Sequence, residues 1–497
     1  RPDDAWQKVR LSVLANRASA ARAAAVLLGP QADIAVRELM KNPQRWLMSA
    51  NVPLDAEQAE LVTLALLRLA RSEPDVVAGL LESRWQRALP SHLAALAWAA
   101  AGQYAAIELS NDATAYYLKA TALRQQAAPV KRLLAPWTDD MLVWQARAAL
   151  RLPGGEKERW LRVTQAVQAL NPADQQDPTW VYWHARAQQA LAKRGDAGDT
   201  DRLAAGSAMA SIAEQLNFYG KLARENLGGK LVLPPAPAPL TAAEREAAAR
   251  NPGFARALDS FRLGLRSEGV REWNFSIRGM DDRELLAAAQ LACDNQIWDR
   301  CINTSERTRQ VVDLAQRFPM PYRNEVLAQA ERVGLDPAFV YGLIRQESRF
   351  MVDIRSSAGA SGLMQLMPAT ARWTAKKVGV PYGGQQITDP DMNLLLGTSY
   401  LKLLMEDFGG SMALATAGYN AGPGRPRRWR EGAVLEPAAW AENIPFSETR
   451  DYVKKVLSNS VYYSALIGKQ PTLLNARLGA NIGPRTAADP ISDRELP

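Results

Sequence analysis

The side chains that could do chemistry are unevenly represented in this 497-residue chain, and the scarcity of some types excludes several kinds of catalytic site. There are two histidines, His92 and His184, and two cysteines, Cys293 and Cys301. A Cys₂His₂ zinc site would need all four, and their spacing does not fit one. A serine or cysteine nucleophile activated by histidine could form only around those two histidines. We therefore expect no metal or cofactor, and acid–base chemistry carried by carboxylates.

One glutamate stands at a position that suits such chemistry. The segment GLDPAFVYGLIRQESRF predicts a helix that begins at the Asp-Pro pair 336–337, a good N-cap followed by a good first residue. Glu347 follows Val340, Leu343 and Ile344 at helical spacing, so it shares their apolar face in the last turn. Desolvation and the negative end of the helix dipole would both raise the pKa of this carboxyl, as a general acid requires. The helix alone favours an ordinary glutamate that bends out to solvent.

A polar loop and a stretch of small residues follow this helix. Ser356 lies in the loop, and Gln365 and Met367 lie in the apolar run that ends at Pro368. Small residues allow the backbone to approach a ligand or another helix closely. A buried amide must be hydrogen-bonded, so Gln365 faces either the protein itself or a polar ligand.

Two further polar residues lie near predicted helix ends. A helix should begin at residues 389–390, and the next one should be short and broken at residues 418–420. Tyr419 at that break could hold a sugar or a carboxyl, or could simply cap the helix. Glu448 falls in the first turn of a helix that begins at Ser447, where the dipole keeps it ionised. Most acidic residues in a first turn only stabilise the start of the helix.

The elements that position these residues are predicted to be almost entirely helical. Residues 1–230 are rich in alanine and leucine at helical spacing, which predicts an α-superhelical solenoid. Residues 231–319 begin with the Pro-rich strap LVLPPAPAPLT and continue as a helical linker domain. Residues 320–497 form the third predicted domain, so the fold class is mainly all-α.

The net charge and the first residue of the chain give expectations about its partners and its location. The net charge of +8 indicates an anionic partner, such as nucleic acid, a membrane surface or an acidic polymer, or only a slightly basic surface. No stretch of about 18 apolar residues could span a membrane. The chain begins at Arg1, so we expect an exported protein whose signal peptide has been removed.

Cys293 and Cys301 could form a disulfide in an oxidising compartment, although their spacing alone favours two buried thiols on one helical face.

Four successive motifs resemble those of the soluble lytic transglycosylases. They are Glu347-Ser348, Gly362-Leu363-Met364-Gln365, Gly418-Tyr419-Asn420-Ala421-Gly422, and residues 444–450 (IPFSETR) with Tyr452-Val453. Their order and spacing over about 130 residues both match. The segment NFYGKLARENLG at residues 217–228 also resembles the family, whereas Gly418 replaces an alanine that many members have.

The resemblance implies a goose-lysozyme-like catalytic domain at roughly residues 320–490, carried on a superhelical body and a linker domain. It implies cleavage of the bond between N-acetylmuramic acid and N-acetylglucosamine in peptidoglycan, with formation of 1,6-anhydromuramoyl ends. Glu347 aligns with the catalytic acid and base. The residues that align with sugar-subsite positions are Ser356, Gln365, Met367 and Tyr419, and Glu448 aligns with a second acidic residue of the groove. Penicillin-binding proteins as partners, and the periplasm of a Gram-negative bacterium, follow from the same resemblance.

Three other functions remain as alternatives. A hydrolytic muramidase on the same fold would need a second base, for which Asp353, Asp389 and Glu448 are the obvious candidates. A non-enzymatic cell-wall scaffold would not need Glu347. Nucleic-acid binding rests on the net charge alone, because no basic cluster with interleaved aromatic residues supports it, so we expect no such partner.

Overall fold

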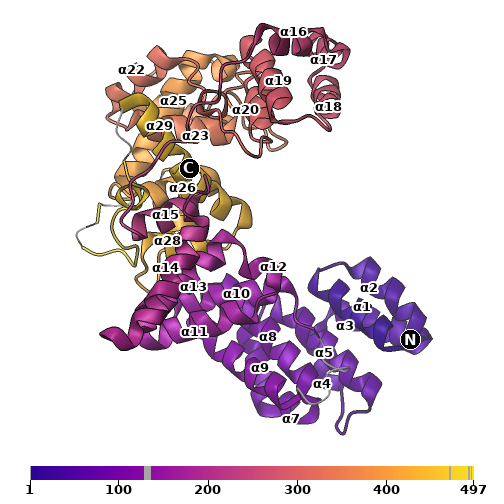
Figure 1. Cartoon of the computed structure of the whole chain (residues 1–497). Coiled ribbons are helices and arrows are strands. Elements are labelled where there is room, and N and C mark those ends of the chain that lie inside the picture. Colours follow the sequence, from indigo (N-terminus) through magenta and orange to yellow (C-terminus); the bar gives the residue numbers. More distant parts are fainter. Residues whose placement is uncertain (1, 128–135, 469–471, 488, 491–492, 494) are drawn as a thin grey trace. The chain divides into compact units, whose positions relative to one another are not determined.

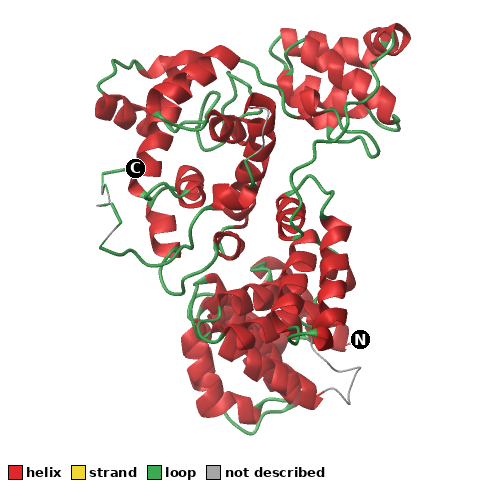
Figure 2. Ribbon diagram, turned by 60° about the vertical axis from the view of Figure 1, so that its left-hand side comes forward, coloured by secondary structure: helices red, strands yellow, loops and turns green. Residues whose placement is uncertain are grey.

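The chain folds into helices joined by loops (Figure 1, Figure 2). The computed structural model describes residues 2–127, 136–468, 472–487, 489–490, 493 and 495–497. Within these residues, backbone pairing outside helices is limited to isolated bridges at Arg355–Ser361, Ser361–Leu366 and Leu435–Ile482. The prediction of a mainly all-α fold is confirmed.

Two compact units make up the described chain. The first contains residues 1–212, 429–450 and 481–484, and the second contains residues 213–428, 451–480 and 485–497. The chain therefore passes between the units several times, and α29 (Ser447–Gly468) has residues in both. The predicted domain limits at residues 230 and 319 stay a prediction.

The first unit is a succession of helices that pack against their neighbours in the chain. Its helices are α1 (Pro2–Leu14), α2 (Ala18–Ala25), α3 (Pro30–Lys41), α4 (Pro43–Ser49), α5 (Ala56–Ala70), α6 (Pro74–Leu80), α7 (Gln86–Ala88), α8 (Ser91–Ile107), α9 (Ala113–Ala127), α10 (Asp139–Arg151), α11 (Glu156–Ala169), α12 (Pro172–Gln175), α13 (Pro178–Leu191), α14 (Asp199–Ile212) and α28 (Pro437–Glu442). Trp98 and Trp183 are fully buried in it, which fits large side chains wedged between alanine-rich helices.

A buried ion pair joins distant parts of the sequence within this unit. Nε and Nη2 of Arg147 on α10 donate to Oε1 of Glu442 on α28, over 3.2 and 3.0 Å. Both side chains are less than a tenth exposed. The segment around α28 is thereby fastened to the helical body, because separating a buried pair leaves an uncompensated charge.

The second unit holds the predicted linker domain and most of the predicted catalytic domain. Its helices are α15 (Phe218–Asn226), α16 (Ala242–Arg250), α17 (Pro252–Arg262), α18 (Arg266–Ser276), α19 (Asp282–Asp294), α20 (Trp298–Ser305), α21 (Leu314–Arg317), α22 (Arg323–Val333), α23 (Pro337–Glu347), α24 (Pro368–Val378), α25 (Pro390–Asp407), α26 (Met412–Ala421), α27 (Gly424–Trp429, whose last residue belongs to the first unit) and α30 (Leu474–Leu478). The Pro-rich strap at residues 231–241 has no regular structure.

The two cysteines are joined by a disulfide, so the sequence-based preference for free thiols is wrong. The reason lies in the backbone between them. A turn at Asn295 and Gln296, where Gln296 has a φ of 59°, separates α19 from α20. Cys293 and Cys301 therefore lie on two helices that face each other, with Cα atoms 5.0 Å apart, and not on one helical face.

A second correction concerns Gly418. The sequence predicts a helix break at residues 418–420, but α26 continues through them to Ala421. A Cβ at Gly418 would lie 3.1 Å from side-chain carbons of Leu404 and Phe408. The glycine therefore allows close packing against α25 and its end, and it does not interrupt the helix.

Close packing also sets the position of α23 against α29. A Cβ at Gly342 would lie 2.8 Å from the carbonyl oxygen of Val456 and 2.4 Å from Oγ of Ser460, so only glycine permits this approach. The rings of Tyr341 and Tyr463 stack beside this crossing, with centroids 5.0 Å apart. The crossing lies about one helical turn from Glu347 on one helix and from Tyr452 on the other.

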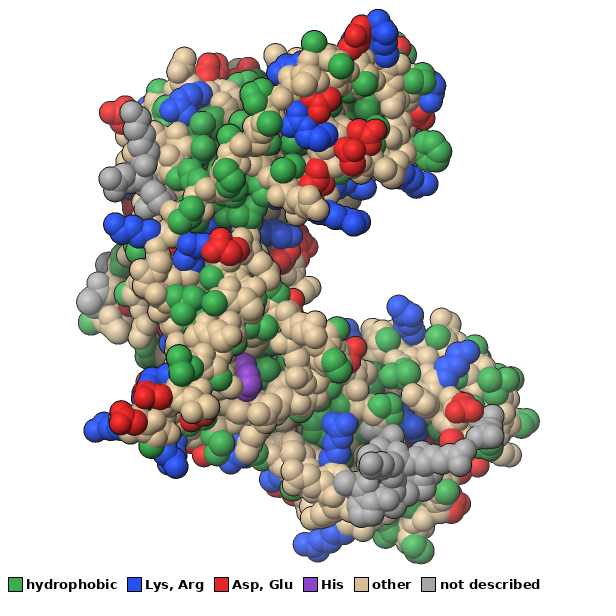
Figure 3. All heavy atoms as spheres, viewed as in Figure 1, with side chains coloured by type: hydrophobic (Ala, Val, Ile, Leu, Met, Phe, Trp, Pro, Cys, Tyr) green, Lys and Arg blue, Asp and Glu red, His purple; other side chains and the backbone are tan. Residues whose placement is uncertain are grey.

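The surface carries both signs of charge. In Figure 3, basic and acidic side chains are interspersed on the visible face of both units. Among the described residues, no helix is both long and apolar enough to cross a membrane.

Candidate active site

Glu347 is the last residue of α23, as the sequence predicts. Asp336 caps the other end, where its side chain accepts a hydrogen bond from the Ala338 N–H over 2.8 Å. The helix between them is almost wholly buried, whereas Glu347 itself is half-buried. The carboxyl group therefore ends a rigid, buried element and keeps access to solvent.

The backbone directly after Glu347 is strained. Arg349 and Phe350 have φ angles of 50° and 66°, a region that residues other than glycine seldom adopt. The buried Phe350 donates its N–H to Oγ of Ser348 over 3.1 Å, which helps hold this conformation. Such strain persists only where the surrounding structure determines it, and it is common at functional sites.

Tyr452 holds the carboxyl group of Glu347 from the neighbouring helix α29. Its side chain is 5% exposed, and its hydroxyl donates to Oε1 of Glu347 over 2.5 Å. Burial first, and then the charge of Glu347, raise the pKa of the Tyr452 phenol well above its ordinary value. The phenol is therefore a neutral donor near neutral pH, and its hydrogen bond stabilises the carboxylate form of Glu347.

Tyr419, on α26, is the second tyrosine close to Glu347. Burial, followed by the charge of Glu347 and by Tyr400, raises the pKa of its phenol well above the ordinary value. Its hydroxyl donates to the carbonyl oxygen of Met364 over 2.8 Å. The phenolic hydrogen thus already has a partner, so Tyr419 would meet a ligand with its ring or as an acceptor.

Gln365 lies in the loop that Tyr419 holds. Its backbone is left-handed, with a φ of 47°, and its Nε2 donates to the carbonyl oxygens of Ile354 and Gly362 over 3.1 and 2.9 Å. Of the two alternatives that the sequence left open, the amide nitrogen therefore faces the protein. These bonds fix the direction of the amide and leave its carbonyl oxygen as the group for a ligand.

A buried asparagine that the sequence analysis did not identify fastens the same loop. Asn393, on α25, accepts from the Met364 N–H over 2.8 Å and donates to the carbonyl oxygens of Ser361 and Ile387 over 2.9 and 2.7 Å. Its side chain is fully buried. A polar residue among the leucines of the first turns of α25 was the available signal, because such a residue needs buried partners.

The remaining predicted site residues have simpler surroundings. Ser356 is half-buried, and its Oγ accepts from the Ala360 N–H over 3.0 Å. Met367 precedes α24 and is 42% exposed. Glu448 is exposed in the first turn of α29, in the part of that helix that belongs to the first unit. The second unit thus brings Glu347 and Tyr419 together with the loop that carries Ser356, Gln365 and Met367.

Tyr452 shows what the sequence analysis missed. It belongs to the last of the four motifs, but the sequence pattern assigns it no role. It lies four residues after Glu448, in a helix whose start the sequence predicts, yet its partner Glu347 is 105 positions away. No local pattern reveals such a contact.

Comparisons with known proteins agree with the motifs. A family model described as the transglycosylase SLT domain matches residues 325–436, and one described as the soluble lytic transglycosylase helical domain matches residues 443–471. The soluble lytic murein transglycosylase of Escherichia coli K12 is 30% identical over 351 residues, which is 69% of this chain and 53% of that protein. The Salmonella typhimurium protein of the same name is 29% identical and covers 74% of this chain and 57% of its own length. The chain thus spans about half the length of these curated relatives.

Solved structures resemble the chain over nearly all of its length. One is the lytic transglycosylase Slt of Pseudomonas aeruginosa, solved as an inactive glutamate-to-glutamine mutant. It has a TM-score of 0.77 and 31% identity, and the match covers 95% of this chain and 74% of that one. The 70-kDa soluble lytic transglycosylase of Escherichia coli has a TM-score of 0.71 over 97% of this chain and 75% of its own, at 24% identity, which supports the fold alone.

Proposed function

Because the chain belongs to the soluble lytic transglycosylase family, we propose that it cleaves the β-1,4 bond between N-acetylmuramic acid and N-acetylglucosamine in peptidoglycan, with formation of 1,6-anhydromuramoyl ends. One observation carries the proposal. A half-buried carboxyl group, Glu347, ends a buried helix on a strained turn and accepts a hydrogen bond from the neutral phenol of Tyr452. That arrangement suits one carboxyl group that both gives and takes a proton.

The proposed reaction uses Glu347 twice. It first protonates the glycosidic oxygen, and the carboxylate then takes the proton of the C6 hydroxyl of the muramoyl residue as that oxygen attacks C1. The substrate's own hydroxyl thus replaces the water or second carboxylate of ordinary glycosidases. Tyr452 stabilises the carboxylate after the first transfer, because its hydroxyl donates to Oε1.

The other site residues would bind and orient the sugars. The fixed carbonyl oxygen of Gln365 can accept from a sugar hydroxyl or amide, the exposed Met367 can cover an apolar sugar face, and the hydroxyl of Ser356 can donate. Tyr419 would contribute its ring. Glu448 would support the positive charge of the oxocarbenium-like state.

Location and partners belong to the same proposal. Curated relatives that carry the name soluble lytic murein transglycosylase come from Escherichia coli and Salmonella typhimurium, which supports the periplasm of a Gram-negative bacterium. Peptidoglycan strands would be the substrate, and penicillin-binding proteins would be partners because they act on the same polymer.

Product analysis of digested sacculi tests the reaction. We expect muropeptides that are lighter by one water than reducing-end products, and reducing ends alone would establish a hydrolytic muramidase instead. The Glu347→Gln variant should lose at least about 100-fold in turnover, the lower range for general acid–base catalysis. Glu331→Gln, a change of an exposed glutamate on the neighbouring helix α22, is the matched control and should keep full activity. Unchanged turnover in Glu347→Gln would refute the assignment of Glu347 as the catalytic residue, whereas absence of turnover in the unmodified chain would support the non-enzymatic scaffold.

A further inference from the structure

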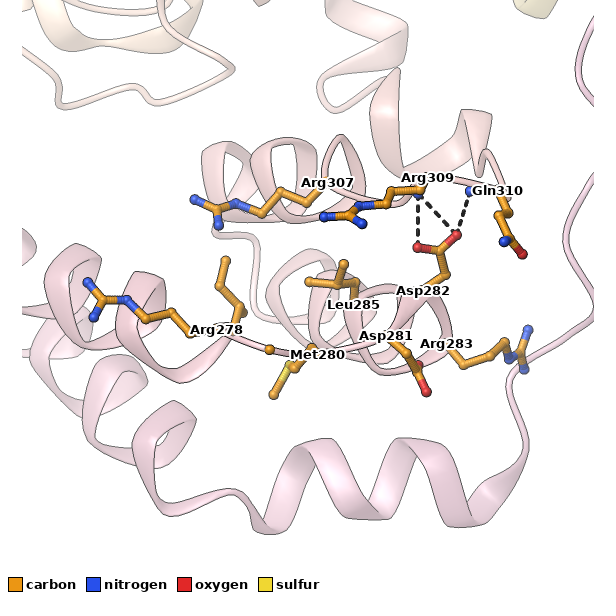
Figure 4. Close-up of a pocket in the computed structure, with 11 residues that line it drawn as sticks. Arg278, Met280, Asp281, Asp282, Arg283, Leu285, Arg307, Arg309 and Gln310 are labelled. Carbon is orange, nitrogen blue, oxygen red and sulfur yellow. Dashed lines mark hydrogen bonds between the residues drawn. The ribbon is translucent and has the colours of Figure 1, made fainter.

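A second site candidate lies in the α18–α20 part of the second unit, outside the residues discussed above. A hollow of about 880 Å³ opens between the loop after α18, the start of α19 and the loop after α20 (Figure 4). It is lined by residues 277–283, 285, 307 and 309–310. Its volume lies within the range of pockets that bind small ligands or short peptides.

The charged groups that stabilise the fold can be separated from those that do not. Asp281 caps α19 by accepting from the Glu284 N–H over 2.9 Å. Arg283 binds Glu244 at 2.7 Å and the carbonyl oxygens of Ala238 and Pro239 in the strap. These groups hold the hollow's walls together.

Asp282 fixes the loop that carries two of the arginines. Its carboxylate accepts from the backbone N–H groups of Arg309, Gln310 and Val311 over 2.7 to 3.2 Å. Figure 4 shows three of these bonds. The hydrogen bonds from Arg309 and Gln310 are the main reason that the pKa of Asp282 is lowered, so the group stays charged and bound to the loop. It is therefore committed to the backbone of this wall.

Three further arginines line the hollow, of which Arg278 lies over the ring of Phe275, 5.1 Å from its centroid, and Arg309 contributes to the lowered pKa of Asp282. Arg278, Arg307 and Arg309 are exposed, and within the described part of the chain none of them forms an ion pair. In Figure 4, Arg307 and Arg309 extend in the same direction from the loop after α20, and Arg278 extends toward the same side from the loop after α18. Like charges along one hollow repel one another, and an oxyanion bound there would reduce that cost.

The floor of the hollow is apolar. Ile277 and Leu285 are buried there, and Met280 packs beside them. Guanidinium groups above an apolar floor suit a ligand that has both carboxylates and aliphatic carbon. They suit nucleic acid less well, because no aromatic ring lines the hollow for base stacking.

We propose that this hollow binds an acidic peptide through its carboxylates, with Arg278, Arg307 and Arg309 as the binding residues. Given the proposed function, which this inference extends, such peptides are the branches of the glycan strand. The hollow would then hold a peptide branch apart from the chemistry at Glu347. Arginine suits the task because its planar guanidinium binds carboxylates through two parallel hydrogen bonds.

Calorimetric titration of the full chain with the free peptide N-acetyl-L-Ala-γ-D-Glu-meso-diaminopimelyl-D-Ala, which is net negative at neutral pH, tests the proposal. The peptide contains no glycosidic bond, so the result does not depend on whether the chain cleaves glycan. We expect binding to the unmodified chain, and binding at least tenfold weaker in the triple variant Arg278→Gln/Arg307→Gln/Arg309→Gln. The same peptide with its carboxylates amidated should not bind. The test therefore distinguishes peptide binding in the hollow from glycan cleavage at Glu347, since the peptide can bind even if the chain does not cleave glycan.

The matched control removes the same number of positive charges, three, from exposed arginines on α16 and α17. It is the triple variant Arg245→Gln/Arg250→Gln/Arg262→Gln, which should bind the peptide within twofold of the unmodified chain. Equal weakening in both triple variants would show only bulk charge and would overturn the proposal. So would binding of the amidated peptide, absence of binding to the unmodified chain, or tighter binding of single-stranded DNA that depends on the same three arginines.

Discussion

The hydrogen bond from Tyr452 to Glu347 can be tested by removing one oxygen atom. Tyr452→Phe keeps the ring that is buried beside α23 and removes the hydroxyl, which lies 2.5 Å from Oε1 of Glu347. A hydrogen bond to a charged group contributes about 1.5–3 kcal/mol. That free energy stabilises the carboxylate and is lost in the variant.

The direction in which the pH profile shifts follows from the role of Glu347 as a proton donor. The first step needs the protonated acid, and the carboxylate is less stable in Tyr452→Phe, so the group keeps its proton to higher pH. Since about 1.36 kcal/mol corresponds to one pH unit, the alkaline limb of kcat/KM should move upward by about one to two units. The acid limb, which reports other groups, should move less.

The assay is the release of soluble fragments from sacculi across the pH range, for the unmodified chain and both variants. The control is Tyr382→Phe, because the Tyr382 hydroxyl is buried and has no hydrogen-bond partner among the described residues. Its profile should match that of the unmodified chain. An alkaline limb of Tyr452→Phe that stays in place or moves to lower pH would refute the assignment of Tyr452 as the group that stabilises the carboxylate.

Two further predictions concern stability. Asn393→Ala should lower the free energy of unfolding by about 3 kcal/mol, because it leaves the Met364 N–H and the Ile387 carbonyl oxygen buried without partners at about 1–3 kcal/mol each, whereas the Ser361 carbonyl oxygen still accepts from the Leu366 N–H. Urea denaturation checks this against Asn324→Ala, an exposed control on α22, and a loss below about 1 kcal/mol would contradict it. Lys221 is buried and donates to Oγ of Ser458, and burial lowers its pKa well below the ordinary value. The unfolded chain then binds more protons than the folded one. The free energy of unfolding should therefore rise as the pH increases toward the pKa that the lysine has in the unfolded chain. Urea denaturation at about pH 7.5 and 9.5 should show that Lys221→Met loses this rise and that the exposed control Lys157→Met keeps it. An equal rise in both variants would contradict the prediction.

Local signals predicted the elements of the site well. The Asp-Pro pairs at residues 336–337 and 389–390 predict the starts of α23 and α25, and Glu347 stands at the end of its helix as expected. Capping depends on side chains within three residues of the helix start, so a single sequence contains the information. The motifs likewise identified the family, since residue types and their order need no folding to be recognised.

The sequence-based predictions were wrong where a residue type or spacing is compatible with two different structures. Gly418 suggested a helix break, but the tertiary structure uses it for close packing within a continuous helix. Cys293 and Cys301 have a spacing that allows one helical face, but the turn at Gln296 places them on facing helices. In both cases the packing partner, and not the local pattern, decides the outcome.

The sequence by itself thus determined the all-α fold, the family and the identity of Glu347 as the candidate acid. The tertiary structure alone decided which group holds that acid, where the amide of Gln365 points, and which three arginines line the hollow beside α19. The physical reason is distance along the chain. Helix starts depend on neighbours a few residues away, whereas Tyr452 and Glu347 meet across 105 positions only because glycine lets α23 and α29 approach closely.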